Sequence, residues 1–339
     1  MTPRLDHVVV VVPVLADAVA AFTSAGFTVC PGGRHDVLPT ENALVAFADG
    51  AYLELLALRE PGTREELRRL RASDGWERHL RGVSAVARRF LPVLTGADGV
   101  GDWVLASSAL ARDAARLRSQ GVVTAGPVAM RRERPDGERL EWDLLLPESF
   151  VQPFVIADRT PRDRRVPGTA AAVTHANGAS GIVAVQVRAQ GGPLAALALG
   201  ETLGVRPRVG SSGATTLACG DWTVDLHPGE PEGAFGVTLA GCRALPEAIT
   251  ALGVQAELDD GRPRREGRRG ESRRARSETP PWSHAAKGPS SRMRRRSTLT
   301  VSVGRTESDG GAHPTLAVAS PRRGGGRDAR PLMQPRRTW

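Results

Sequence analysis

The stretch LDHVVVVV (residues 5–12) decides the fold, together with a second apolar run, AYLELLAL (residues 51–58). Runs of this kind are typical of strands that are covered on both faces. Each run carries an ionisable side chain, His7 in the first and Glu54 in the second. Burying such a group is costly unless a partner compensates it. We therefore expect His7 and Glu54 to meet on neighbouring strands in one concavity, paired with each other, a metal or a substrate proton.

One order of elements recurs along the chain: an apolar strand, a short helix that stops at a glycine, and further strands. The pattern predicts copies over residues 5–58, 102–157 and 181–227, and a fourth that begins at 235, has its helix over 244–252 and breaks off near 258. Helical sequence over 63–91 separates the first two copies. One βαβββ module leaves a sheet face open, so modules should pair to close a core. The predicted fold class is α+β, with βαβββ modules paired into cupped mixed sheets.

The composition changes near Gly261. Residues 261–339 hold 20 basic and six acidic side chains, a net charge of +14, so residues 1–260 carry −5 of the total of +9. We predict four parts: two modules over 1–165, a linker over 166–180, the third module and a truncated fourth over 181–260, and a disordered Arg-rich tail over 261–339. Two interpretations of the tail stay open. It is either a basic arm for an anionic surface or the product of a frame change that interrupts the fourth module.

Charge and cysteine content exclude several classes of protein. Because the body is mildly acidic, we do not expect the folded part to bind nucleic acid. The three cysteines (Cys30, Cys219 and Cys242) show neither disulfide nor metal spacing, which suits a reducing compartment. The sequence shows no secretory leader and no apolar segment of roughly 20 residues. We therefore expect a cytoplasmic protein without membrane association.

Four segments carry a resemblance to a known family: LDHVVVVVP (5–13), GGRH (32–35), TENALVAFADGAYLELLA (40–57) and THANGASGIVAVQV (174–187). Together they resemble the glyoxalase-like branch of the vicinal oxygen chelate superfamily, over roughly residues 4–245. The resemblance implies paired βαβββ modules and a divalent metal held in the cup by the first and last strands of each module. His7 and Glu54 match the two ligand positions of the first module, whereas the second module offers Trp103, Val104 and residues 154–156, which are not normal ligands.

Other polar or aromatic residues are candidates for substrate binding. Arg34 and His35 follow two glycines at a strand end, either as a solvated loop or as a clamp for an anion or carbonyl. Asn42 either caps a loop or hydrogen-bonds a ligand, and Trp142 alternates with apolar neighbours as a core or cup-wall aromatic. His175 either folds back over the first cup or belongs to a plain turn. The candidate substrate-binding residues are Arg34, His35, Asn42, Trp142 and His175.

Two functions remain open from the sequence. In the first, a divalent ion on His7, Glu54 and waters chelates adjacent oxygens of a small substrate and stabilises an enolate-like charge, as in a lyase, isomerase or dioxygenase of this superfamily. Glu54 would then move the proton. In the second, the same cup sequesters a small molecule without chemistry, as bleomycin-resistance proteins do. The expected partner is a small-molecule ligand in either case, and a homodimer is a further expectation.

Overall fold

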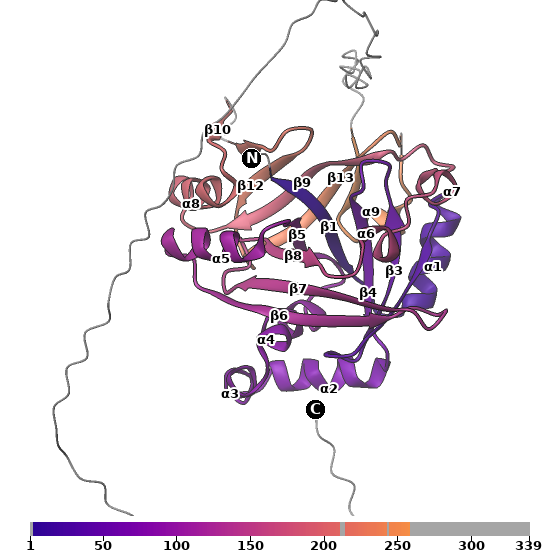
Figure 1. The fold of residues 1–339 in the computed structure, drawn as a ribbon, viewed down its shortest axis with the longest axis horizontal. Helices are drawn as coiled ribbons and strands as arrows, with labels where there is room; N and C mark the ends of the chain where they lie inside the picture. The colour runs from indigo at the N-terminus through magenta and orange to yellow at the C-terminus, as the bar shows by residue number, and fades with distance from the viewer. Residues whose placement is uncertain (1–2, 211–213, 243, 258–339) are drawn as a thin grey trace, which may run out of the picture. The chain divides into compact units, whose positions relative to one another are not determined.

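The first two modules close into a barrel (Figure 1). The computed structural model describes residues 3–210, 214–242 and 244–257. Module one consists of β1 (Arg4–Val11), α1 (Leu15–Ser24), β2 (Cys30–His35), β3 (Thr40–Ala46) and β4 (Tyr52–Leu58). Module two consists of β5 (Gly99–Ala106), α5 (Leu110–Ser119), β6 (Thr124–Glu133), β7 (Arg139–Pro147) and β8 (Phe154–Asp158). The barrel order is β1-β4-β3-β2-β6-β7-β8-β5, so the modules join through β1–β5 and β2–β6. The predicted fold class is confirmed.

Strand β1 is buried on both faces, as its valine run predicts. Val8 and Val10 pack outward into a core shared with α1 and a second sheet, and Val9 and Val11 pack into the barrel interior. All four side chains have at most 1% of their surface exposed. Because side chains alternate along a strand, His7 belongs to the same inward face as Val9 and Val11. The neighbouring strand β4 runs parallel to β1 and places Glu54 beside Val9.

The segment between the modules covers one end of the barrel. It forms α2 (Pro61–Arg71), α3 (Trp76–Gly82) and α4 (Ala85–Leu94). The Ser84 hydroxyl caps α4 by accepting a hydrogen bond from the backbone N–H of Ala87. Phe90 and Leu94 of α4 join the interior core of the barrel. The insertion therefore forms part of the wall of the barrel interior.

The remaining strands form a separate six-stranded sheet. Its elements are β9 (Gly181–Ala189), α8 (Pro193–Leu203), β10 (Pro207–Val209), β11 (Thr215–Ala218), β12 (Thr223–Pro228), β13 (Gly233–Ala240), α9 (Glu247–Thr250) and β14 (Val254–Ala256). The strand order is β10-β11-β12-β9-β13-β14. In this order β14, the last described strand of the fourth module, lies at an edge of the sheet. The helix predicted over 244–252 is shorter, because only Glu247–Thr250 is helical. The predicted tail, 261–339, lies outside the described residues.

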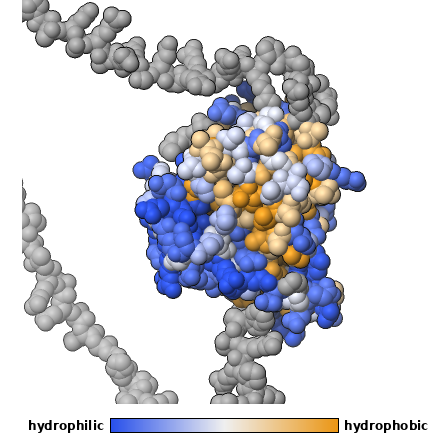
Figure 2. All heavy atoms as spheres, turned by 90° about the vertical axis from the view of Figure 1, so that its right-hand side faces the viewer, coloured by the Kyte–Doolittle hydropathy of each residue, from blue (hydrophilic) through white to orange (hydrophobic). Residues whose placement is uncertain are grey.

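The barrel and the second sheet belong to one compact unit. The Trp103 and Trp222 rings meet edge to face with centroids 6.2 Å apart, and the backbone N–H of Val100 donates to the carbonyl of Leu252 over 2.8 Å. Two short helices, α6 (Arg162–Arg165) and α7 (Ala170–Val173), lie in the connection between barrel and sheet. Figure 2 views the molecule from the side of α1 and α7, where apolar side chains adjoin a strongly hydrophilic region. No helix in the described part of the chain is long and apolar enough to cross a membrane.

Candidate functional site

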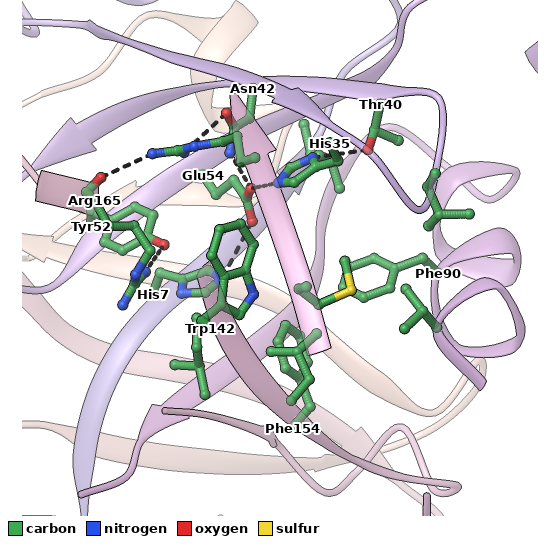
Figure 3. Close-up of a pocket in the computed structure, with 17 residues that line it drawn as sticks. His7, His35, Thr40, Asn42, Tyr52, Glu54, Phe90, Trp142, Phe154 and Arg165 are labelled. Atoms are coloured by element: carbon green, nitrogen blue, oxygen red, sulfur yellow. Dashed lines mark hydrogen bonds and ion pairs between the residues drawn. The ribbon is translucent and has the colours of Figure 1, made fainter. Parts of the chain in front are cut away.

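A cavity of about 50 Å³ lies inside the barrel, with polar groups at one end and apolar groups at the other (Figure 3). Its main polar lining residues are His7, His35, Asn42, Glu54, Arg132 and Arg165. Its apolar wall includes Leu56, Phe90, Met130, Trp142, Phe154 and Ile156. A space of this size takes only a few atoms as large as a water molecule. The cavity is therefore suited to one end of a small ligand.

His7 and Glu54 meet in this cavity, as the two apolar runs predicted. The His7 Nε2 atom lies 3.3 Å from Glu54 Oε2, and both side chains are nearly fully buried. The other ring nitrogen, Nδ1, lies 2.7 Å from Asp6 Oδ1. Adjacent residues on a regular strand point to opposite faces, but the pairing of β1 with β5 skips Asp6, since Leu5 pairs with Leu105 and His7 with Val104. This bulge lets Asp6 and His7 lie side by side.

A cluster of arginines holds Asp6 in place. Arg165 of α6 donates to both carboxylate oxygens of Asp6 over 3.1 and 3.0 Å, and Arg162 contacts Oδ2. Arg165 also donates to the Tyr52 hydroxyl over 2.7 Å and pairs with Asp158. The Tyr52 ring in turn stacks on the His7 ring, with centroids 4.6 Å apart. Asp6 and Tyr52 thus fix both the tautomer and the plane of the His7 imidazole.

The charges of these three groups depend on one another. Burial by itself would lower the pKa of His7, but the hydrogen bonds and charges of Asp6 and Glu54 raise it above the usual value. Burial by itself would raise the pKa of Glu54, but the hydrogen bond and charge of His7, with His35 and Asn42, lower it to about 2. Burial would also raise the pKa of Asp6, but Arg165 and His7 hold it well below its usual range. The two carboxylates therefore favour the protonated form of His7, and His7 in turn favours the ionised form of both carboxylates.

Two further predicted residues reach the same carboxylate. The Asn42 side-chain amide donates to Glu54 Oε1 over 2.5 Å, and His35 Nε2 lies 3.9 Å from the same oxygen. His35 Nδ1 lies 3.0 Å from the Thr40 hydroxyl. Burial lowers the pKa of His35 to about 4 despite the nearby Glu54 charge. His35 is therefore neutral at pH 7, and Asn42 orients Glu54.

Arg132 brings a charge to the cavity that the sequence did not single out. Arg132 is 3% exposed, and its guanidinium donates to Asn42 Oδ1 over 3.2 Å and to the Arg165 carbonyl over 3.1 Å. Its Nε atom is buried and has no hydrogen-bond partner. Burial lowers the pKa of Arg132, although the nearby Tyr52 and Glu54 raise it. Arg132 follows Met130 by two positions on β6, so the alternation of inward residues was the only sequence signal for it.

The structure brings His7, Glu54, His35, Asn42 and Trp142 together and leaves Arg34 and His175 outside the cavity. Arg34 is exposed and lies on an outer groove of about 1090 Å³ between α1, β2 and the β6–β7 turn. His35 and Asn42 line both spaces, so they form the partition between groove and cavity.

His175 has a different position, between the connection after α7 and module one. It accepts a hydrogen bond from Thr28 N–H over 3.0 Å, and its Nε2 lies 3.0 Å from the carbonyl of Ala46. Its ring also meets Phe27 and Phe47 edge to face. These contacts tie the connection to the outer face of module one, so the geometry gives His175 a structural role.

The described residues offer too few ligands for the divalent metal that the resemblance implies. A catalytic metal usually takes three protein ligands and keeps an open position. Val104 lies opposite His7 on β5 and Phe154 lines the cavity from β8, so module two places apolar groups at its counterpart positions. Within the described residues, no three His, Cys, Asp or Glu side chains are arranged to hold a metal ion. The donor set does not fit a catalytic metal, and the assignment of His7 and Glu54 as metal ligands stays a prediction.

The contribution of α4 and α6 to the site could not be read from the sequence. Phe90 enters the cavity from the inserted helix α4, and Arg165 enters from a four-residue helix beyond the last barrel strand. Neither residue belongs to a βαβββ module. The apolar face of α4 recurs at helical spacing, but this shows only that the face is buried and not which space it covers, and the four residues of α6 are too few to show any period. Only the closure of the barrel brings them to the cavity.

Comparison with known proteins agrees with this architecture. A crystal structure of a hypothetical protein from Staphylococcus aureus is 16% identical, matches 71% of this chain and 92% of that chain, and has a TM-score of 0.55, which shows a shared fold. Streptomyces coelicolor methylmalonyl-CoA epimerase, in complex with 2-nitronate-propionyl-CoA, is 18% identical over 47% of this chain and all of that chain, with a TM-score of 0.28.

A xylose isomerase-like TIM barrel/4-hydroxyphenylpyruvate dioxygenase fusion protein is 12% identical over 75% of this chain and 38% of that chain, with a TM-score of 0.42. None of the curated proteins matches the chain. The model of the glyoxalase-like domain family matches residues 5–203, which is more than half of the chain. With its two βαβββ modules closed around His7 and Glu54, the chain belongs to the glyoxalase-like domain family.

Proposed function

We propose that the chain is an enzyme that moves a proton on a small carbonyl-bearing substrate, in reactions of the lyase or isomerase type. One observation carries the proposal: an acid and a base, His7 and Glu54, lie 3.3 Å apart inside a largely apolar cavity, with Asp6 on the far nitrogen of His7. An imidazole backed by a buried carboxylate is a common arrangement in acid–base catalysis. The adjoining apolar wall keeps the site dry and strengthens its electrostatic interactions.

In the proposed step, Glu54 accepts a proton from the carbon next to the substrate carbonyl. The C–H electron pair forms the new C=C bond, and the carbonyl oxygen takes up the charge and a proton or hydrogen bond from His7 Nε2. Asp6 stabilises the imidazolium, and Asn42 holds Glu54 through its Oε1 atom over 2.5 Å. No step requires a metal, although the substrate carries the adjacent oxygens that the superfamily resemblance implies.

The low pKa of Glu54 fits this proposal, because it results from the contact with His7, and a bound substrate would break that contact. A carboxylate with a pKa of about 2 is a weak base while His7 is in contact with it. A substrate oxygen that takes the His7 Nε2 proton displaces this contact. The remaining burial then raises the pKa of Glu54 toward the range where a general base works well.

Proton exchange tests the proposal without knowledge of the natural substrate. The full-length protein is incubated in D₂O with pyruvate, hydroxyacetone and dihydroxyacetone, and ¹H NMR follows loss of the protons next to each carbonyl. We expect accelerated exchange for at least one compound, and a loss of about 10²-fold or more in Glu54→Gln and in His7→Asn. Glu65→Gln is the matched control, because Glu65 is an exposed residue of α2 paired with Arg69. Equal exchange in the protein, both variants and a protein-free sample would reject the proposal.

A binding function without chemistry is the second candidate. The observation that favours it is that both oxygens of Glu54 already have partners, His7 and Asn42. A thermal-shift screen with organic ligands, in the presence and absence of divalent ions and a chelator, separates the candidates. Stabilisation by a ligand that undergoes no proton exchange supports sequestration, and metal-dependent stabilisation supports the predicted metal at His7 and Glu54.

A further inference from the structure

Four arginines of the described residues are buried, and Arg132 differs from the other three. Arg64 pairs with Asp98, Arg89 with Asp102, and Arg165 with Asp6 and Asp158. Arg132 has no carboxylate within ion-pair distance among the described residues, and its two hydrogen bonds go to neutral oxygens, Asn42 Oδ1 and the Arg165 carbonyl. The guanidinium of Arg132 is therefore hydrogen-bonded, but its buried charge is not neutralised by a touching counter-ion as the other three are.

The position of Arg132 shows where the counter-ion would lie. Its side chain lines the same cavity as His7 and Glu54, and its Nε is a buried donor without an acceptor. Glu54 is close enough to interact with Arg132 through its charge but does not touch it. Arg132 therefore brings a positive charge without a touching counter-ion, and a donor without an acceptor, to the wall of the space that a ligand would occupy.

We infer that Arg132 is the receptor for a substrate carboxylate, so that the substrate is a small 2-oxo or 2-hydroxy acid whose carbonyl or hydroxyl oxygen points to His7. Guanidinium groups bind carboxylates with charge-assisted hydrogen bonds, which are stronger than those to neutral acceptors. The cavity of about 50 Å³ has room for a carboxylate and the adjacent carbon and oxygen. This inference rests on the proposed function, since it names the substrate class for the same site.

Binding, measured separately from turnover, tests the inference. Isothermal titration and thermal shift are carried out on the full chain with pyruvate, with butane-2,3-dione as its neutral analogue, and with acetate, which lacks the adjacent oxygen. We expect pyruvate to bind more tightly than either analogue by about tenfold or more, and Arg132→Gln to abolish that preference. Arg131→Gln, the exposed neighbour on the same strand, should leave it intact.

The stability of the unliganded variant gives a second readout. An arginine with a structural role destabilises the fold when it is removed, whereas removal of an unpaired buried charge leaves the melting temperature unchanged or raises it. We expect Arg132→Gln to melt at or above the parent temperature, and Arg132→Lys to keep part of the preference for pyruvate. A large drop in melting temperature in both variants, or equal binding of pyruvate and butane-2,3-dione by the parent protein, would overturn the inference.

Failure of this inference is distinguishable from failure of the proposed function. Glu54→Gln should still bind pyruvate, because the receptor is Arg132, while it loses proton exchange. If pyruvate shows no preference but hydroxyacetone exchanges its protons in a Glu54-dependent reaction, the carboxylate receptor is wrong and the proton-transfer function stands. If pyruvate binds through Arg132 but no compound exchanges, the receptor stands and the site binds without chemistry.

Discussion

Replacement of Arg89 by methionine should loosen the helix that covers the barrel. Arg89 is 3% exposed. Its guanidinium donates to both oxygens of Asp102 over 2.8 Å and to the carbonyls of Pro147, Ser149 and Gln152 over 2.8–2.9 Å. Asp102 is fully buried and would keep only the hydrogen bond from the Trp103 N–H. These bonds join α4 to β5 and to the segment between β7 and β8.

The expected loss follows from the charge that is left behind. Removing one partner of a buried pair costs about 3–5 kcal/mol, mainly because the other charge stays buried without compensation. The three carbonyls that lose a donor add to this cost. We therefore expect Arg89→Met to lower the free energy of unfolding by about 4 kcal/mol or more. For a folded part of this size the melting temperature should fall by about 8–16 °C.

Urea unfolding of four variants measures the coupling between the two residues. They are the parent, Arg89→Met, Asp102→Leu and the double variant, which together form a double-mutant cycle. The double variant should be more stable than Arg89→Met alone, because it leaves no buried charge. Arg88→Met is the control, since Arg88 is exposed on the same helix and its side chain donates to the Leu80 carbonyl, not to a buried carboxylate. A loss below about 1 kcal/mol in Arg89→Met, or additive single losses, would refute this reasoning.

Three further predictions concern the cavity. The pKa of His35 is lowered to about 4, so between pH 6.5 and 4 His35 is protonated in the unfolded chain but not in the folded one, and the free energy of unfolding should decrease by roughly 3 kcal/mol as the pH is lowered through this range. In His35→Phe the free energy of unfolding, measured with urea, should depend less on pH between 6.5 and 4.5. A pH dependence equal to that of the parent would contradict this. A Cβ on Gly32 would lie 2.0 Å from Asn42 Oδ1 and 2.6 Å from the Asn42 carbonyl, so Gly32→Ala should lower the melting temperature, whereas Gly62→Ala, with nothing within 4 Å, should not. Phe154→His should add a third ligand to His7 and Glu54 and lower the dissociation constant for Co²⁺ by at least about tenfold. The absorption spectrum of bound Co²⁺ measures this affinity. An affinity equal to that of the parent protein would show that the number of ligands does not limit metal binding.

Much of the fold was predictable because it depends on local patterns. Apolar alternation located the strands, and glycines located the helix ends, so the repeated module could be recognised before any contact was known. The predicted helix over 244–252 was too long, because the backbone is extended at Pro246 and residues 251–253 form a turn before β14. Asp6 was part of the quoted strand. Its position beside His7 depends on the bulge in the pairing of β1 with β5, which no sequence pattern predicted.

The candidate site divides in the same way. His7, Glu54, His35, Asn42 and Trp142 were predicted and lie on one cavity, because strand alternation and the family pattern place them on inward faces. Their catalytic and binding roles stay predictions. Arg34 lies in the outer groove, and His175 has structural hydrogen bonds outside the barrel. Both were selected for their chemistry and their nearness to glycines in the sequence, which does not fix where a side chain points.

The sequence by itself determined the module, its repetition and the two inward-facing ionisable residues, because these follow from the period of two along a strand and from the high cost of burying a charge. Only the tertiary structure decided which charges meet. The barrel closes two modules, a helical insertion and a connecting segment around one space, and it brings Arg165 to Asp6 across 159 positions and Arg132 to Asn42 across 90. Electrostatic partners depend on distance in space, and no local pattern in the chain records it.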